Sequence, residues 1–153
     1  MVEYRMATVE DADTLAVIRL DFFGEGRAFS EEDKKVLLEN NRSYLRESLT
    51  EGSFVAWIAL SEGEIVATSG VNFYRQPPNP GCKNGQVANI ANMFTYAPYR
   101  KQGIATKLFA LCVEEAKKRG CGKVVLTASD MGRPLYEKYG FVDTKGDMVY
   151  TLQ

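Results

Sequence analysis

The pattern that most constrains the fold is an amphipathic helix over residues 103–119, set between two strands. Its apolar side chains recur along one stripe, its charged side chains lie elsewhere, and Gly120 ends the pattern. The residues before it, 86–96, have the pattern of a strand, and those after it, 123–129, have the pattern of a buried strand. Strands and helices that alternate in this way are typical of an α/β sheet.

The remaining patterns complete a mixed order of elements. The other predicted elements are strands at 2–7, 53–60, 65–74 and 148–152, helices at about 9–23 and 31–50, and a short helix at 133–140. The expected fold class is therefore α/β, with one domain over residues 1–153. Helices should flank a mixed sheet in the order β-α-α-β-β-β-α-β-α-β, with a further strand at 141–143 as an option.

Length and charge narrow the class of protein. A chain of 153 residues is long enough for one domain with its own core. The formal net charge of −1 argues against nucleic acid as a partner, because such binding usually needs a basic surface. No apolar run approaches the length of a membrane-spanning helix, and the N-terminus lacks a hydrophobic signal core. We therefore expect a cytoplasmic protein with no membrane partner.

The chain contains no histidine. Its absence excludes Ser-His and Cys-His nucleophilic mechanisms and histidine-based zinc sites, and no metal is expected. Chemistry must come from carboxylates, tyrosine, cysteine, lysine or the backbone. The three cysteines contain no Cys-x-x-Cys pair, so no disulfide framework is expected. No histidine is present to lower a thiol pKa, which argues against a cysteine nucleophile.

A glycine turn with two cationic residues lies at the N-terminus of the helix predicted over residues 103–119. The first N–H groups of a helix lack intrahelical partners and lie at the positive end of its dipole, so they form an anion site. Gly103 allows close approach to the backbone, and Arg100 and Lys101 add charge. The alternative is a tight turn with surface cations around it. The P-loop and Rossmann glycine patterns do not occur.

A third phosphate-binding pattern does occur. The stretch "RKQGIA", residues 100–105, fits Arg/Gln-x-x-Gly-x-Gly/Ala, and "LYEKYGF", residues 135–141, follows it in a short predicted helix. The opening "RMATVED", residues 5–11, also matches a first strand and helix start. Together these stretches resemble the GNAT superfamily of N-acetyltransferases. The resemblance covers essentially the whole chain and is most specific over residues 86–141.

The resemblance implies acetyl-CoA as acyl donor and a set of residues that bind it. Tyr136 matches the tyrosine that donates a proton to the departing CoA thiolate, although a core tyrosine that packs the short helix is the alternative. Ser129 stands where many members have an asparagine that contacts the CoA arm. The implied CoA-binding residues are Met93, Phe94 and Thr95 beside the pantetheine, Arg100, Lys101, Gln102, Gly103, Ile104, Ala105 and Thr106 at the pyrophosphate, and Ser129.

Superfamily members carry a bulge in the strand before the turn. Asn89 and Asn92 are three residues apart and would face opposite sides of a regular strand, so a bulge between them would turn both to one face. Alternatively, one asparagine points to solvent or caps a turn. The resemblance also implies an oxyanion donor in this strand, a backbone N–H near Phe94.

The catalytic base departs from the superfamily pattern. Many members have a glutamate or aspartate in the bulged strand, but residues 89–95 contain no carboxylate. The base is then a carboxylate from elsewhere, such as Asp21 or Glu25, a water chain, or no group at all if the amine has a low pKa.

The resemblance implies direct transfer of an acetyl group to an amine of a small molecule or peptide. A protein lysine is a further acceptor, and a non-catalytic acyl-CoA-binding module is the alternative function. The acceptor pocket is expected around residues 21–35 and 75–85. Because superfamily members often dimerise, a homodimer is one expectation.

Overall fold

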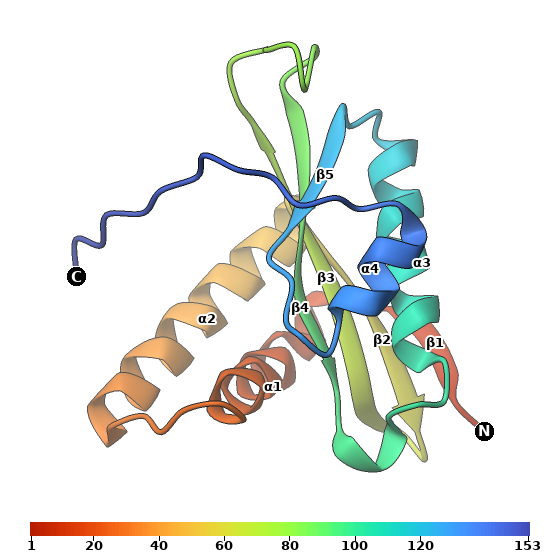
Figure 1. Ribbon diagram of the computed structural model, residues 1–153. Coiled ribbons are helices and arrows are strands. Elements are labelled where there is room, and N and C mark those ends of the chain that lie inside the picture. The colour runs from red at the N-terminus through yellow and green to blue at the C-terminus, as the bar shows by residue number, and fades with distance from the viewer.

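The computed structural model describes residues 1–153 and has three layers (Figure 1). A five-stranded sheet lies in the middle, with two helices packed on each face. None of the helices combines the length and apolar character that crossing a bilayer demands. The elements, in chain order, are β1 (Glu3–Met6), α1 (Ala12–Gly24), α2 (Glu31–Glu51), β2 (Phe54–Ser61), β3 (Glu64–Arg75), β4 (Gln86–Thr95), α3 (Ile104–Lys118), β5 (Lys123–Leu126) and α4 (Arg133–Tyr139).

The sheet is mixed, as the order of elements predicts. Its strands lie in the order β1-β2-β3-β4-β5. The first four are antiparallel neighbours, whereas β4 and β5 run parallel, with α3 as the crossover between them. Parallel neighbours need such a crossover because a hairpin turn joins only antiparallel strands. The predicted α/β class is therefore confirmed.

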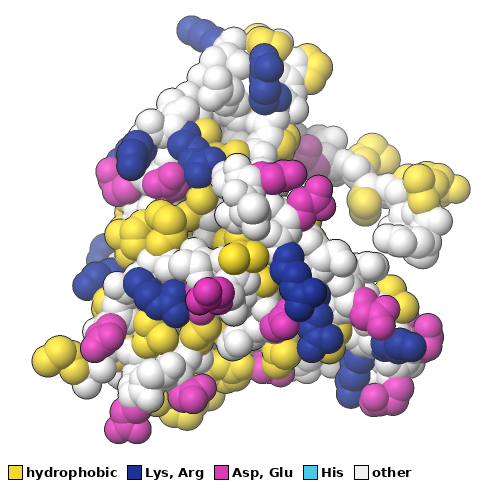
Figure 2. All heavy atoms as spheres, turned by 180° about the vertical axis from the view of Figure 1, so that it is seen from behind, with side chains coloured by type: hydrophobic (Ala, Val, Ile, Leu, Met, Phe, Trp, Pro, Cys, Tyr) yellow, Lys and Arg dark blue, Asp and Glu magenta, His cyan; other side chains and the backbone are white.

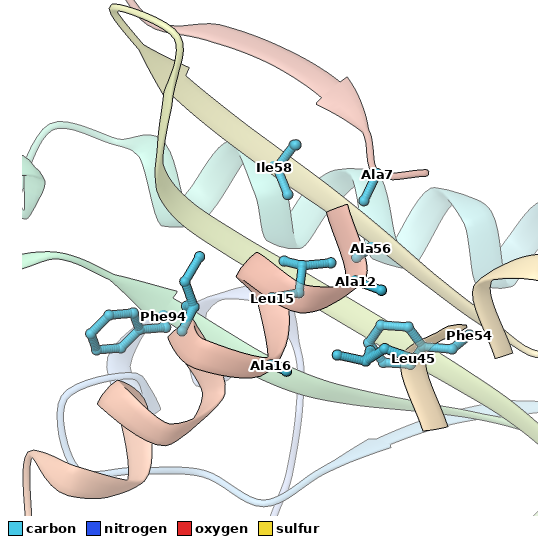
Figure 3. Packing of buried hydrophobic residues seen from close by; sticks show 10 residues of the cluster. Ala7, Ala12, Leu15, Ala16, Leu45, Phe54, Ala56, Ile58 and Phe94 are labelled. Atoms are coloured by element: carbon cyan, nitrogen blue, oxygen red, sulfur yellow. The ribbon is translucent and has the colours of Figure 1, made fainter. Parts of the chain in front are cut away.

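Three apolar clusters hold the helices on the sheet: one under α1 and α2, one under α3 and α4, and a smaller one under the start of α3. The first two are the larger. Side chains of β2 alternate between them: Ala56 and Ile58 pack with α1 and α2, and Val55 packs with α3 and α4. Figure 3 shows the first core, in which Leu15 of α1 and Leu45 of α2 meet the sheet. Every second side chain of β2 thus packs against the apolar faces of α1 and α2, and together they form one buried layer.

The boundaries of α2 are set by one capping residue at each end. Ser30 is the N-cap, and its hydroxyl oxygen accepts a hydrogen bond from the N–H of Asp33 at 3.1 Å. Gly52 ends the helix in the left-handed conformation, with φ of 81°. Such a cap contributes about 1 kcal/mol, and glycine adopts positive φ without a Cβ clash.

The predicted strands at 148–152 and 141–143 are wrong. After α4 the chain runs without regular structure away from the sheet. Figure 2 shows this arm projecting from the body with apolar side chains on it. Met148 is 98% and Tyr150 87% exposed, so the apolar pattern of this segment meets no core. A strand needs a partner that supplies its hydrogen bonds, and the tail of this chain does not lie beside one.

Candidate active site

A bulge interrupts β4 where it approaches the end of β5. Thr68 of β3 pairs with Phe94, but Gly70 pairs with Ala91, so one residue of β3 faces both Asn92 and Met93. Asn92 has φ of 59°, a left-handed conformation that asparagine tolerates better than most residues. The extra residue reverses the alternation, so Phe94 packs towards α1 instead of α3.

The strand therefore has the predicted bulge, but its expected position between Asn89 and Asn92 is wrong, because the pairing is regular from Asn89 to Ala91 and the bulge consists of Asn92 and Met93. Asn89 and Asn92 both line the cleft between β4 and β5. Asn89 donates from Nδ2 to Oδ1 of Asn72 at 2.8 Å. Asn92 is only 4% exposed, and neither polar atom of its side chain has a hydrogen-bond partner. A buried unpaired amide is costly, so this side chain is available to a ligand.

The parallel pair separates beyond the bulge and opens a cleft. β4 and β5 pair from Val87 with Lys123 to Ile90 with Leu126 and no further. The cleft between them has a volume of about 600 Å³. Its walls come from the end of α1, the bulged part of β4, the segment after β5 and α4. Its lining residues are Arg19, Phe22, Phe23, Gly26, Arg27, Asn89, Ile90, Ala91, Asn92, Met93, Leu126, Thr127, Ala128, Ser129 and Tyr136.

Three of the predicted site residues line this cleft together: Met93, Ser129 and Tyr136. The oxygen of the Ser129 hydroxyl accepts a hydrogen bond from the N–H of Gly132 at 3.1 Å and keeps its own proton free to donate. Ser129 therefore both shapes the turn into α4 and presents a donor to the cleft.

The ring of Tyr136 is held tightly between aromatic side chains and the backbone. It is 6% exposed, and its centroid lies 5.2 Å from that of Phe109. A Cβ on Gly132 would lie 2.8 Å from the Tyr136 hydroxyl oxygen, so only glycine leaves room for the ring. Burial raises the pKa of Tyr136, which keeps the hydroxyl protonated at neutral pH. Tyr139 is 43% exposed and does not line the cleft.

The glycine turn presents a run of unpaired amides. The N–H groups from Lys101 to Thr106 form no hydrogen bond with another part of the chain. Lys101 and Gly103 both have positive φ, of 60° and 79°. Left-handed residues among right-handed ones point successive N–H groups in one direction, which creates an anion-binding concavity at the helix N-terminus.

The side chain of Arg100 is turned away from these amides. Its Nε donates to the carbonyl oxygen of Thr95 at 2.8 Å, and its Nη2 forms an ion pair with Glu25. The Thr95 carbonyl is thus occupied within the protein. Asp21 similarly accepts a hydrogen bond from the Tyr96 hydroxyl. Neither acid lines the cleft, so neither occupies the position of a base beside Tyr136.

A second cleft, of about 350 Å³, adjoins the first between α1, α2 and the sheet. Arg19 lines both clefts, and its guanidinium lies 4.8 Å from the centroid of the Phe23 ring. Of the region expected to form the acceptor pocket, residues 22, 23, 26 and 27 line the larger cleft, whereas the proline loop at 75–85 lines neither cleft. Sequence inspection missed Arg19; its one signal is a cation within the apolar run "AVIRLDFF", residues 16–23.

A three-layer fold whose parallel strand pair separates beside a bulge, ahead of a helix with free N-terminal amides, is an acetyltransferase fold. The chain belongs to the acetyltransferase (GNAT) family, whose family model matches residues 14–141.

Individual relatives agree with this assignment. Aminoglycoside N(6')-acetyltransferase type 1 of Serratia marcescens is 30% identical over 119 residues, which cover 73% of this chain and 79% of that protein. A predicted acetyltransferase from Clostridium acetobutylicum, whose crystal structure includes acetyl-CoA, is 35% identical with a TM-score of 0.88, covering 99% of this chain and 97% of that one. A GCN5-related N-acetyltransferase from Ralstonia eutropha has the same fold, with a TM-score of 0.90 at 24% identity over the full length of both chains.

Proposed function

We propose that the protein is an acetyl-CoA-dependent N-acetyltransferase that transfers acetyl directly to the amine of a small molecule or peptide. The observation that carries this proposal is the run of unpaired amides from Lys101 to Thr106, at the end of a strand that borders an open cleft. These donors fit the pyrophosphate of acetyl-CoA, and they have no acceptor within the protein. The open space beside Gly103 is free of protein atoms within 4 Å of a Cβ position.

The separated strands suit the extended arm of the donor. Beyond Ile90, backbone groups of β4 that would pair with β5 face the cleft instead. They are suited to bind an amide-containing chain as a neighbouring strand would. The hydroxyl of Ser129 offers one more donor on the opposite wall, at the position for which sequence predicted a contact.

The bound donor supplies an acetyl thioester, and the chain's own groups assist its transfer. The backbone N–H groups at Asn92 and Met93 lie in the bulge, where the ladder is interrupted, so they are the candidates to stabilise negative charge on the carbonyl oxygen. Tyr136 keeps its proton at neutral pH and gives it to the departing thiolate. The amine nitrogen bonds to the acetyl carbon as the carbon–sulfur bond breaks.

No side chain of the cleft is a conventional base. The lining residues include no aspartate, glutamate, lysine or cysteine, so the attacking amine gives up its proton to water. The same feature favours one alternative, an acyl-CoA-binding module without turnover. Acetyl-CoA binding with no CoA release in the presence of any amine would identify that module.

Replacing Gly103 with valine tests the donor site. The new side chain meets open space in the free protein, so the fold should lose only the cost of positive φ, about 1–2 kcal/mol. If the pyrophosphate occupies that space, calorimetric titration should show acetyl-CoA affinity reduced at least tenfold, about 1.4 kcal/mol. Gly63→Val is the matched control, because Gly63 has φ of 83°, equally open surroundings and a place in the β2–β3 turn. Equal affinity in both variants would refute the assignment.

A further inference from the structure

The two clefts meet at four residues that line both: Arg19, Asn89, Ala91 and Asn92. Under the proposed function, the larger cleft between β4 and β5 holds the thioester end of the donor. The smaller cleft, between α2 and the sheet, then opens from the reacting carbon and is where the acceptor must enter. The side chains of this smaller cleft therefore decide which amines are accepted.

The charge of these clefts is positive and unbalanced. Arg19 and Arg27 are the charged residues that line them, and no carboxylate does so. The whole chain, by contrast, has a net charge of −1. Arg19 forms no ion pair, and burial lowers the pKa of its guanidinium with no carboxylate to offset the effect. A partly buried guanidinium without a partner in the protein is suited to bind an anion.

Amide side chains surround this guanidinium. The side chains of Asn72 and Asn89 are hydrogen-bonded to each other, which fixes both in the lining of the smaller cleft. Asn92, almost fully buried, leaves its Oδ1 and Nδ2 without partners at the junction. Two more amides, from Asn40 and Asn41 of α2, complete the lining. Amides give neutral donors and acceptors, which suit the polar body of a small molecule.

We propose that the acceptor is a small primary amine that carries an oxyanion, a carboxylate or a phosphate, held by the guanidinium of Arg19 while Asn92 orients the amine. This inference rests on the proposed acetyl transfer and deepens it. The planar guanidinium forms two parallel hydrogen bonds with an oxyanion, and such charge-assisted bonds are among the strongest in proteins. The oxyanion takes the place of the missing carboxylate as the counterion of Arg19.

The same charges disfavour polycationic acceptors. The relative from Serratia marcescens is named for aminoglycosides, which carry several ammonium groups. In this chain such a molecule would meet two arginines and no acid. The two carboxylates that the sequence suggested as bases, Asp21 and Glu25, are bound to Tyr96 and Arg100 and line neither cleft. We therefore expect aminoglycosides to be poor acceptors.

Matched pairs of amines test the proposal. The pairs are 4-aminobutyrate with 4-aminobutanamide and phosphoethanolamine with ethanolamine, with an aminoglycoside as the polycation. CoA release should show kcat/KM about 10–100-fold higher for the anionic member of at least one pair, and the favoured pair distinguishes carboxylate from phosphate. Arg19→Gln should bring that ratio close to one. Titration of the anionic amine into the CoA-saturated protein should show the same loss of affinity without turnover.

Two controls separate this inference from the proposed function. Arg46→Gln removes a surface arginine of α2 that is bonded to Asp13 at 2.7 Å, and it should leave the ratio unchanged. Acetyl-CoA titration of Arg19→Gln should still show binding, which verifies the fold and the donor site. Faster turnover of the neutral amines or the aminoglycoside, or a ratio independent of Arg19, would overturn the inference while the proposed function stands. No binding of acetyl-CoA would overturn both.

Discussion

Gly132 lies so close to the ring of Tyr136 that a substitution of this glycine should move the Tyr136 hydroxyl without removing it. In Gly132→Ala the new Cβ would lie 2.8 Å from the hydroxyl oxygen and from Cε2. Ordinary contacts begin at 3.4 Å, so the ring must move by about 0.6 Å, the difference between 3.4 and 2.8. Phe109 blocks one side of the ring, with centroids 5.2 Å apart. The ring is therefore expected to shift towards the cleft.

The change in the free energy of unfolding caused by Gly132→Ala is the sum of two opposed effects. Overpacking of this kind costs roughly 1–3 kcal/mol. Gly132 has φ of −83° and ψ of −23°, which alanine adopts freely, so the substitution also gains about 0.4–1 kcal/mol from the unfolded state. The net loss of unfolding free energy should be about 1–2 kcal/mol by urea denaturation. A misplacement of about 1 Å can cost ~10²-fold in rate, so we expect kcat to fall roughly tenfold. Acetyl-CoA affinity should change little.

Gly24→Ala is the control for the glycine substitution itself. Gly24 ends α1, has no protein atom within 4 Å of a Cβ position and does not line either cleft. It should become slightly more stable, by up to about 1 kcal/mol, with kcat unchanged. If Gly132→Ala is as stable and active as wild type, the ring of Tyr136 is not confined as described. If stability falls but kcat does not, Tyr136 is a packing residue without a role in proton transfer.

Three further predictions test the mechanism, the fold and the core. Tyr136→Phe should lower kcat and kcat/KM together by about 10²-fold, the low end for a general acid, whereas Tyr139→Phe should stay near wild type. The Arg5 guanidinium, 2.8 and 2.9 Å from the two carboxylate oxygens of Asp11, lowers the pKa of that carboxyl. The stabilisation is present above the unfolded pKa and is lost as the pH falls through the folded one. Asp11→Asn should therefore destabilise the protein at pH 7, and its difference from wild type in urea titrations should shrink as the pH falls below about 4. Burial raises the pKa of Cys112 to about 12, so iodoacetamide at pH 8 should leave this thiol unmodified until urea unfolds the chain, and rapid modification of the native protein would contradict its burial.

The fold was largely predictable because its signals are local. Helical and strand periodicities gave the order of elements, and the cap at Ser30 and the glycine turn at 103 marked where helices begin. The closing strand at 148–152 was not predictable on the same basis. Its residues, MVYTL, favour a strand, but a strand exists only where a neighbour supplies hydrogen bonds, and that neighbour is set by tertiary structure.

The candidate site was predictable where a motif fixes the backbone. The amides at 101–106 and the tyrosine of "LYEKYGF" follow from short contiguous patterns. Arg19 belongs to no motif, and its place in the clefts depends on how α1 is rotated over β4. Asp21 and Glu25 were candidate bases because they belong to the first helix and the loop after it, yet their observed partners are Tyr96 and Arg100. Contacts between distant segments decide such roles.

A cleft without carboxylate, lysine, cysteine or histidine has a consequence for how pH controls flux. With no base to titrate, the rate follows the fraction of acceptor that is unprotonated, which for an alkylamine of pKa ~10.4 is about 1 in 2,500 at pH 7. The rate should then rise about tenfold per pH unit, and each acceptor should give its own pH profile, displaced by its own pKa. A fall of half a pH unit in the cell would slow acetylation about threefold with the protein itself unchanged.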